Sequence, residues 1–195
     1  KAKLTVRRSL SLLANGALAV NLEFDVPAAL DDLPRLGWSL VLPAGFENFT
    51  FFGNGPHENY CDRRAGSLIS LYKQTVTGQY VPYMLPQECG NHTAVRLAAV
   101  DNGKVGLLAV APQQMECSAL HFTPADFFTA GHTNELEVRP ETFFNLDLGQ
   151  RGLGTASCGE DTRHRYRLHP GIHRFSFYLL PFTVPGRIMD LGRQL

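Results

Sequence analysis

The chain has 195 residues, 44% of them hydrophobic and 18% charged, so it can bury a substantial core, and its composition argues against disorder. Lys plus Arg and Asp plus Glu number 18 each, which gives a formal net charge of zero and no basic surface for nucleic acid or an anionic membrane. No apolar run approaches the ~18 residues that cross a bilayer. We therefore expect neither a nucleic acid nor a membrane as partner.

Three β-hairpins are predicted in chain order, each from two runs of alternating apolar and polar residues that flank a turn signal. Residues 3–13 and 17–26 flank Asn15-Gly16, which favours a type I′ turn, and residues 95–100 and 105–110 flank Asp101-Asn102-Gly103. The third pair, residues 163–168 and 174–180, flanks His169-Pro170-Gly171.

Only one short helix is indicated, over residues 123–130 with Pro124 in its first turn. Roughly a dozen short strands separated by turn residues are typical of a large antiparallel β-sandwich and not of βαβ units. We predict an all-β fold and a single domain over residues 1–195. In this division, residues 1–30 are a linking hairpin and residues 181–195 are a tail.

The densest polar stretch is residues 53–63, GNGPHENYCDR, which follows the apolar run 49–52. A strand therefore leads directly into a loop in which Glu58, Asp62 and Arg63 can pair. A functional loop fits this pattern, and so does a surface turn with a solvated ion pair.

Residues 80–91, YVPYMLPQECGN, combine aromatic rings, prolines, an amide and a carboxylate. Aromatic faces beside polar groups suit a sugar, so Tyr80, Tyr83 and Glu88 are candidate sugar contacts. An extended edge strand with buried tyrosines explains the same residues.

No catalytic residue is assigned. A retaining glycosidase needs two carboxyls ~5 Å apart, and nothing in the spacing of the acidic residues brings any two together. The glycine-rich residues 152–159 have no amphipathic helix after them, so a tight turn is favoured over a phosphate site. No metal site or cofactor is expected, because His164, His169 and His173 straddle a turn.

The four cysteines form no CxxC pair, which speaks against a zinc knuckle or a dense disulfide framework. Isolated thiols and a first segment without signal-peptide features favour a reducing, cytoplasmic compartment. The cysteines are Cys61, Cys89, Cys117 and Cys158.

Several motifs occur together in this order: GPxExYxDR at residues 55–63, PQExG at residues 86–90, and Pro34-Arg35-Leu36-Gly37. Residues 118–123 and 132–136 add to the pattern. Over nearly its whole length the chain resembles the C-terminal domain of family 2 β-galactosidases.

This resemblance implies a β-supersandwich of the galactose-mutarotase-like type, in an enzyme whose catalytic glutamates sit on a separate (β/α)8 barrel. It also implies that the loop from Gly55 to Arg63 opens and closes over the active site, and that the late glycine-rich loop lies beside the substrate. The substrate-proximal residues would be Gly55, Glu58, Asn59, Asp62, Arg63, Ser157 and Cys158.

Two departures from the family pattern bear on specificity. The late loop lacks the tryptophan found in better-known relatives, since the only tryptophan is Trp38, and Ala94 replaces a common aspartate. The resemblance therefore implies a divergent subgroup with a less aromatic aglycone site.

The expected partners are the other domains of the parent β-galactosidase and a galactoside substrate, in a homo-oligomer that uses divalent and monovalent cations elsewhere. Two alternatives stay open: a free-standing carbohydrate-binding module that uses Tyr80, Tyr83 and Glu88, and a mutarotase-like aldose epimerase.

Overall fold

The computed structural model describes residues 2–153, 159–184 and 188–193 of the chain. Nine β-strands and two short α-helices occur in these residues, and every strand pairing is antiparallel, which confirms the all-β prediction. The strands are β1 Thr5–Leu12, β2 Leu18–Val26, β3 Arg35–Leu42, β4 Asn48–Gly55, β5 Leu68–Thr75, β6 His92–Asp101, β7 Val105–Leu120, β8 Thr142–Gln150 and β9 Gly171–Thr183, and the helices are α1 Pro124–Thr129 and α2 Ile188–Gly192.

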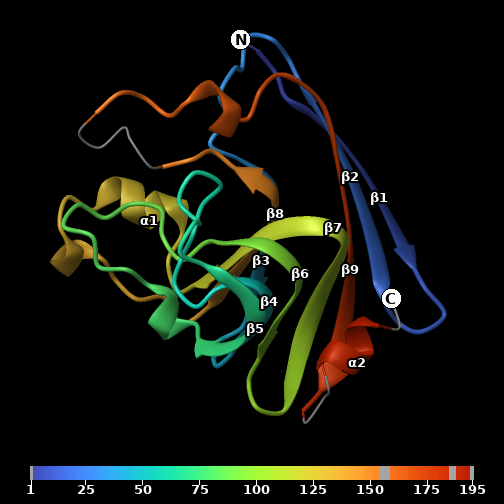
Figure 1. Cartoon of the computed structure of the whole chain (residues 1–195). Coiled ribbons are helices and arrows are strands. Elements are labelled where there is room, and N and C mark those ends of the chain that lie inside the picture. The colour runs from blue at the N-terminus through green and yellow to red at the C-terminus, as the bar shows by residue number, and fades with distance from the viewer. Residues whose placement is uncertain (1, 154–158, 185–187, 194–195) are drawn as a thin grey trace.

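The long strand β7 determines the architecture because it changes partners along its length. Its residues 106–110 pair with both β6 and β9, whereas residues 116–120 pair with β8 while Met115 and Cys117 still pair with β6. The main sheet runs β1-β2-β9-β7-β6-β4-β5, and β8 and β3 branch from the second half of β7. Figure 1 shows the resulting curve, with β1, β2 and β9 on one side of the molecule and β3, β4, β5, β6 and β8 on the other. The result is a sandwich-like fold.

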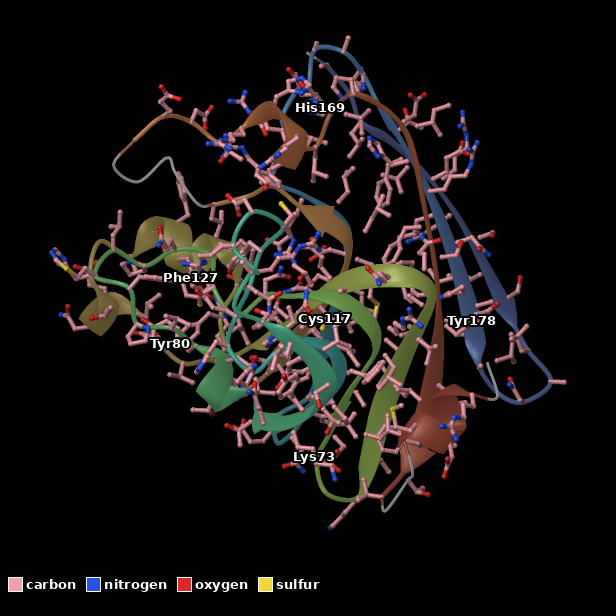
Figure 2. The ribbon with its side chains drawn as sticks, in the orientation of Figure 1. Lys73, Tyr80, Cys117, Phe127, His169 and Tyr178 are labelled. Carbon is pink, nitrogen blue, oxygen red and sulfur yellow. The ribbon has the colours of Figure 1, made fainter. Side chains whose placement is uncertain are left out.

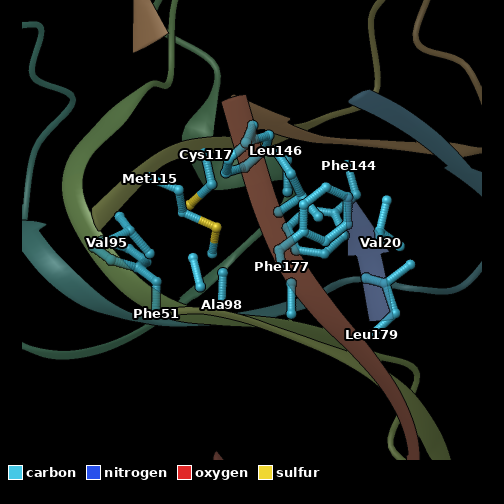
Figure 3. Close-up of a cluster of buried hydrophobic side chains, with 14 of the residues drawn as sticks. Val20, Phe51, Val95, Ala98, Met115, Cys117, Phe144, Leu146, Phe177 and Leu179 are labelled. Carbon is cyan, nitrogen blue, oxygen red and sulfur yellow. The ribbon is translucent and has the colours of Figure 1, made fainter. Parts of the chain in front are cut away.

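Aromatic and aliphatic side chains from both sides of this curve form the main core (Figure 3). Phe51 of β4, Phe144 of β8 and Phe177 of β9 are almost completely buried, and Met115 of β7 fills the space beside Phe51 and Val95. Each such side chain stabilises the fold by roughly 1.5 to 3 kcal/mol through burial alone. The core therefore joins strands that are far apart in the sequence.

The first two predicted hairpins are confirmed as β1–β2 and β6–β7. Gly16 and Gly103 both have positive φ, at 82° and 81°. The prediction of a type I′ turn at Asn15-Gly16 is wrong, however. A type I′ turn needs a positive φ at both central residues, and Asn15 does not have one.

The third predicted hairpin is wrong in its first strand. Residues His164–Tyr166 form a 3-10 helix, and Leu168 makes only an isolated bridge to Leu33. The arginines of this segment do not line a sheet face: the Arg167 guanidinium lies 2.9 Å from Asp161, and the Arg165 guanidinium lies over the Tyr166 ring. The second strand is present as β9, which pairs with β2 and β7.

Helix α1 is confirmed. Thr123 is its N-cap, and a capping box is complete because the Thr123 side chain accepts from the Asp126 backbone N–H while the Asp126 side chain accepts from the Thr123 N–H. Arg139 donates to both Asp126 oxygens at 2.7 Å and holds the pKa of this carboxyl well below its usual range.

The two ends of the described chain pack on the sheet. The hairpin β1–β2 pairs with β9 along the whole of β2. Strand β9 continues through Thr183, and Met189 and Leu191 of α2 pack on a separate buried cluster that includes Leu97. Among the described residues, no helix is long and apolar enough to cross a bilayer.

Candidate functional site

The loop of residues 56–67 connects β4 to β5, and Glu58 anchors it. One carboxylate oxygen of Glu58 accepts from the Gly90 backbone N–H at 2.7 Å. The other accepts from the Tyr83 hydroxyl and from the Arg63 guanidinium, which is 2.5 Å away. The Glu58 side chain is only 9% exposed. The structure therefore brings together Glu58, Arg63 and Tyr83, which are predicted residues from two separate motifs.

Asn59 fixes the middle of this loop and is completely buried. Its amide nitrogen donates to the backbone oxygens of Asn54 and His57, each at 3.0 Å. Its amide oxygen accepts from the N–H and the hydroxyl of Thr93, at 2.9 and 2.6 Å. Asn91 in turn donates to the Asn59 backbone oxygen at 3.0 Å. Asn59 thus ties the loop to the start of β6.

Asp62 connects the loop to the start of the late glycine-rich segment. Its Oδ1 accepts from the Leu153 backbone N–H at 3.2 Å. A side chain at Gly152 would place its Cβ 2.5 Å from the Asp62 carboxyl carbon, so this contact requires glycine. The predicted residues Ser157 and Cys158 lie outside the described residues.

Gly55 is the last residue of β4, and its backbone is not in the left-handed region. A Cβ at this position would lie 2.6 Å from the ring of Tyr72. The glycine is therefore required by close approach to Tyr72. Beside it, a cavity of about 470 Å³ is lined by residues that include Gly55, Glu58, Asp62 and Arg63.

Buried ionic groups lie behind the loop. The Arg35 guanidinium donates to both oxygens of Asp147 and lies 3.6 Å from Glu88. Burial raises the pKa of Glu88 and of Asp147, and the positive charge of Arg35 opposes that rise. Nearby, burial raises the pKa of Glu116 to about 7, although Asn91 donates to its carboxylate at 2.9 Å.

Tyr80 lies apart from these groups. Its ring centroid is 5.0 Å from that of Phe122 and 6.3 Å from that of Phe127, and Figure 2 shows Tyr80 and Phe127 on the same side of the molecule. The Tyr80 hydroxyl is buried and has no hydrogen-bond partner within the described part of the chain. Tyr80, Tyr83 and Glu88 therefore do not form one platform, because Tyr83 binds Glu58 and Glu88 faces Arg35.

Trp38 packs against the main core. It is on β3, and its ring makes an edge-to-face contact with Phe177 of the core at 6.2 Å. No aromatic role at a sugar site follows from this position.

Sequence reasoning did not identify the network behind the loop. Asp147, Asn91 and Gln150 are almost completely buried, and Gln150 donates to Asn91 at 3.1 Å. One available signal is the polar residue Asp147 within the apolar run TFFNLDLGQ of β8, because a charge in a buried strand needs a partner. The partner, Arg35, stands 112 residues earlier in the chain.

The chemical capacity of the site is binding and positioning. Both oxygens of Glu58 are held by hydrogen bonds, and Glu88 and Asp147 share one guanidinium. Within the described ranges, no three His, Cys, Asp or Glu side chains are arranged to hold a metal ion.

The fold and the site thus define an antiparallel β-domain whose polar loop is fixed by buried hydrogen bonds. The family model for the β-galactosidase small chain matches residues 2–179, and the chain belongs to this family. It is similar to the β-galactosidases of Priestia megaterium (30% identical, 82% of this chain), Staphylococcus xylosus (28%, 85%) and Streptococcus thermophilus (31%, 75%).

The chain spans only 15%, 17% and 14% of the length of these three relatives. Its relatives are therefore much larger proteins, and the other parts of such a protein are the implied partners. The comparisons give no support to a free-standing carbohydrate-binding module or to an aldose epimerase.

Proposed function

We propose that this chain is an accessory domain of a β-galactosidase that hydrolyses terminal β-galactosides, and that loop 56–67 acts as a lid beside the active site. The parent enzyme is a cytoplasmic homo-oligomer, and this domain has the galactose-mutarotase-like type of supersandwich. Catalytic glutamates and bound cations belong to other parts of that enzyme.

The contact between Asp62 and Leu153 carries the proposal. Loop 56–67 and the late glycine-rich segment are the two parts of the chain that the family resemblance puts next to the substrate. They are about ninety residues apart in sequence, and the hydrogen bond from the Leu153 N–H to Asp62 joins them. Two such segments meeting at one place support a common role at the edge of a substrate site.

The hydrogen bonds of Glu58 support an accessory role for this chain and not a catalytic one. Catalytic carboxyls face each other across the scissile bond, ~5 Å apart in a retaining enzyme. Glu58, in contrast, uses both of its oxygens to hold Gly90, Tyr83 and Arg63. Glu58 therefore serves as a position-setting group of the loop.

The face of β1 next to the core supports an interdomain contact. Val6 and Leu10 pair with Phe24 and Val20 of β2, so their side chains lie on the face of the sheet that is buried in β2. On β1 this face is uncovered, since Val6 is 47% and Leu10 49% exposed. An apolar sheet face without cover is where another part of the parent polypeptide would pack.

The lid proposal is tested by Glu58→Gln in the full-length β-galactosidase that carries this chain. Glutamine keeps the shape of the side chain but removes the negative charge that pairs with Arg63, and it replaces one of the two accepting oxygens with a donating amide. If closure of the loop contributes to turnover, kcat and KM should change in different proportions. A shift of ~1.4 kcal/mol in the free-energy difference between the open and closed states changes the ratio of their populations tenfold.

The matched control is Glu137→Gln, an exposed glutamate outside the loop. It should leave kcat, KM and the melting temperature unchanged. Gly55→Ala is a less specific test because its methyl group would collide with the Tyr72 ring. Wild-type kcat and KM in Glu58→Gln, with or without a loss of stability, would show that the loop is a static turn.

A further inference from the structure

A second cavity, of about 370 Å³, opens between the start of β3, residues 86–88, α1 and the end of β8. Its size lies within the ~300 to 1,000 Å³ range of small-molecule sites. It shares no lining residue with the cavity beside loop 56–67. A function of this second cavity therefore does not depend on whether loop 56–67 moves.

The polar part of the cavity wall contains a carboxylate that lacks a full set of partners. Glu88 Oε2 lies 3.6 Å from Arg35, and the Gln150 side chain lies near the carboxyl group, but Glu88 Oε1 is buried and no described donor reaches it with hydrogen-bond geometry. The side chain as a whole is 23% exposed, so it is reachable from the cavity. Because the terminal torsion of glutamate is soft, a small rotation presents this oxygen to a donor in the cavity. An unpaired buried acceptor is costly, and a ligand hydroxyl would satisfy it.

The apolar part of the wall is formed by Phe128, Pro86 and Leu153. Phe127 and Phe128 follow each other on α1, yet Phe127 is 5% exposed and Phe128 is 92% exposed. Phe127 belongs to a buried cluster, whereas the Phe128 ring is free to act as a stacking surface at the cavity rim.

The charges around the cavity select the ligand. One guanidinium, Arg35, faces two carboxyl groups, Glu88 and Asp147, so its positive charge is already engaged and is not available to an anion. The other cation of the wall, Arg151, is already bound to Asp32 at 2.7 Å and to Asp161 at 2.5 Å. Anions are therefore disfavoured. A stacking ring together with an accepting carboxylate suits a neutral ring that carries hydroxyl groups and has an apolar face.

We propose that this cavity binds a neutral saccharide, with the apolar face of a sugar ring on Phe128 and a sugar hydroxyl donating to Glu88. The proposal rests on the proposed function to the extent that a galactoside-hydrolysing enzyme meets saccharides. It requires neither a moving lid nor a catalytic group in this chain.

Titration of the 195-residue chain with lactose, followed by amide NMR, tests the proposal. We expect saturable shifts at residues 86–88 and on α1. Phe128→Ala should weaken binding by roughly 2- to 10-fold, the range expected for loss of one stacking contact. Since Phe128 is exposed, this variant should melt as the wild type does. Glu88→Gln provides a second variant, whose melting curve and amide dispersion are recorded in parallel.

Met84→Ala is the matched control, because Met84 is 94% exposed and does not line the cavity. Its lactose affinity should equal that of the wild type. Absence of saturable shifts, or shifts that Phe128→Ala leaves unchanged, overturns the proposal. If the chain binds no lactose and Phe128→Ala destabilises the full-length enzyme, the cavity instead receives another part of that polypeptide. The lid proposal is judged separately, by the kinetics of Glu58→Gln.

Discussion

Glu116 should control much of the pH dependence of folding. Burial raises the pKa of this carboxyl from 4.5 to about 7, with repulsion from Asp147 adding to the rise and the hydrogen bond from Asn91 opposing it. The folded chain therefore holds the proton more tightly than the unfolded chain does. The corresponding stability is fully present below about pH 4.5 and is lost as the pH rises through about 7.

The size of the effect follows from the pKa difference. At 1.36 kcal/mol for each pKa unit, ionisation of Glu116 costs the folded state up to about 3 kcal/mol, an upper bound because the side chain is only partly buried by solvent accessibility. Glu116→Gln removes this cost and keeps an oxygen that can accept from Asn91. For a chain of this size, ~1 kcal/mol moves the melting temperature by about 2 to 4 °C. The variant should therefore gain up to roughly 6 to 12 °C over the wild type at high pH.

The assay is a series of thermal melts from pH 5 to pH 8 for the wild type and Glu116→Gln. Asp147, Arg64 and Cys61 also face Glu116, and the pKa values of Asp147 and Glu88 are raised as well. The difference between the two curves isolates the contribution of Glu116 from that of these neighbours. Glu137→Gln is the exposed control and should follow the wild type. Parallel curves for the wild type and Glu116→Gln would refute the reasoning.

Two further predictions concern α1 and β1. Thr123→Ala removes the N-cap of α1 and should lower the free energy of unfolding by ~1 kcal/mol in chemical denaturation. Thr129→Ala removes an exposed hydroxyl that donates to backbone oxygens already bonded within the helix, and it should change the free energy of unfolding by less than ~0.5 kcal/mol. An equal loss in both variants would contradict the capping role. Leu10 is already 49% exposed, so Leu10→Asp should destabilise the isolated chain by only about 1 kcal/mol, but it should destabilise the full-length enzyme by at least ~1 kcal/mol more. Equal effects in both contexts would show that β1 has no covering partner.

Local signals predicted the elements that depend on near neighbours. The β1–β2 and β6–β7 hairpins follow from alternation around a glycine turn, and α1 follows from Thr123 and Pro124 at its start. These features need only the residues on either side of a turn or cap.

Pairings between distant segments were not predictable from such signals. The first half of strand β7 pairs with β9 and the second half pairs with β8. No residue type in β7 predicts this change of partner. Residues 163–168 alternate like a strand, yet His164–Tyr166 form a 3-10 helix and Arg167 pairs with Asp161. Arg35 and Asp147 are likewise far apart in sequence. The sequence shows that each is charged, but it does not predict that they contact each other.

Asn59 limits how loop 56–67 can move if it acts as a lid. Its side chain is completely buried and bonded to Asn54 and Thr93, so moving it would leave several buried polar groups without partners, at ~1 to 3 kcal/mol each. The flanking contacts are less costly to break, since Arg63 is 47% exposed and Asp62 is partly exposed. Tyr60 is completely buried as well, so opening would pivot at Asn59 and Tyr60 and would break the contact of Asp62 with Leu153, which places the moving part of the lid on the side of Leu153.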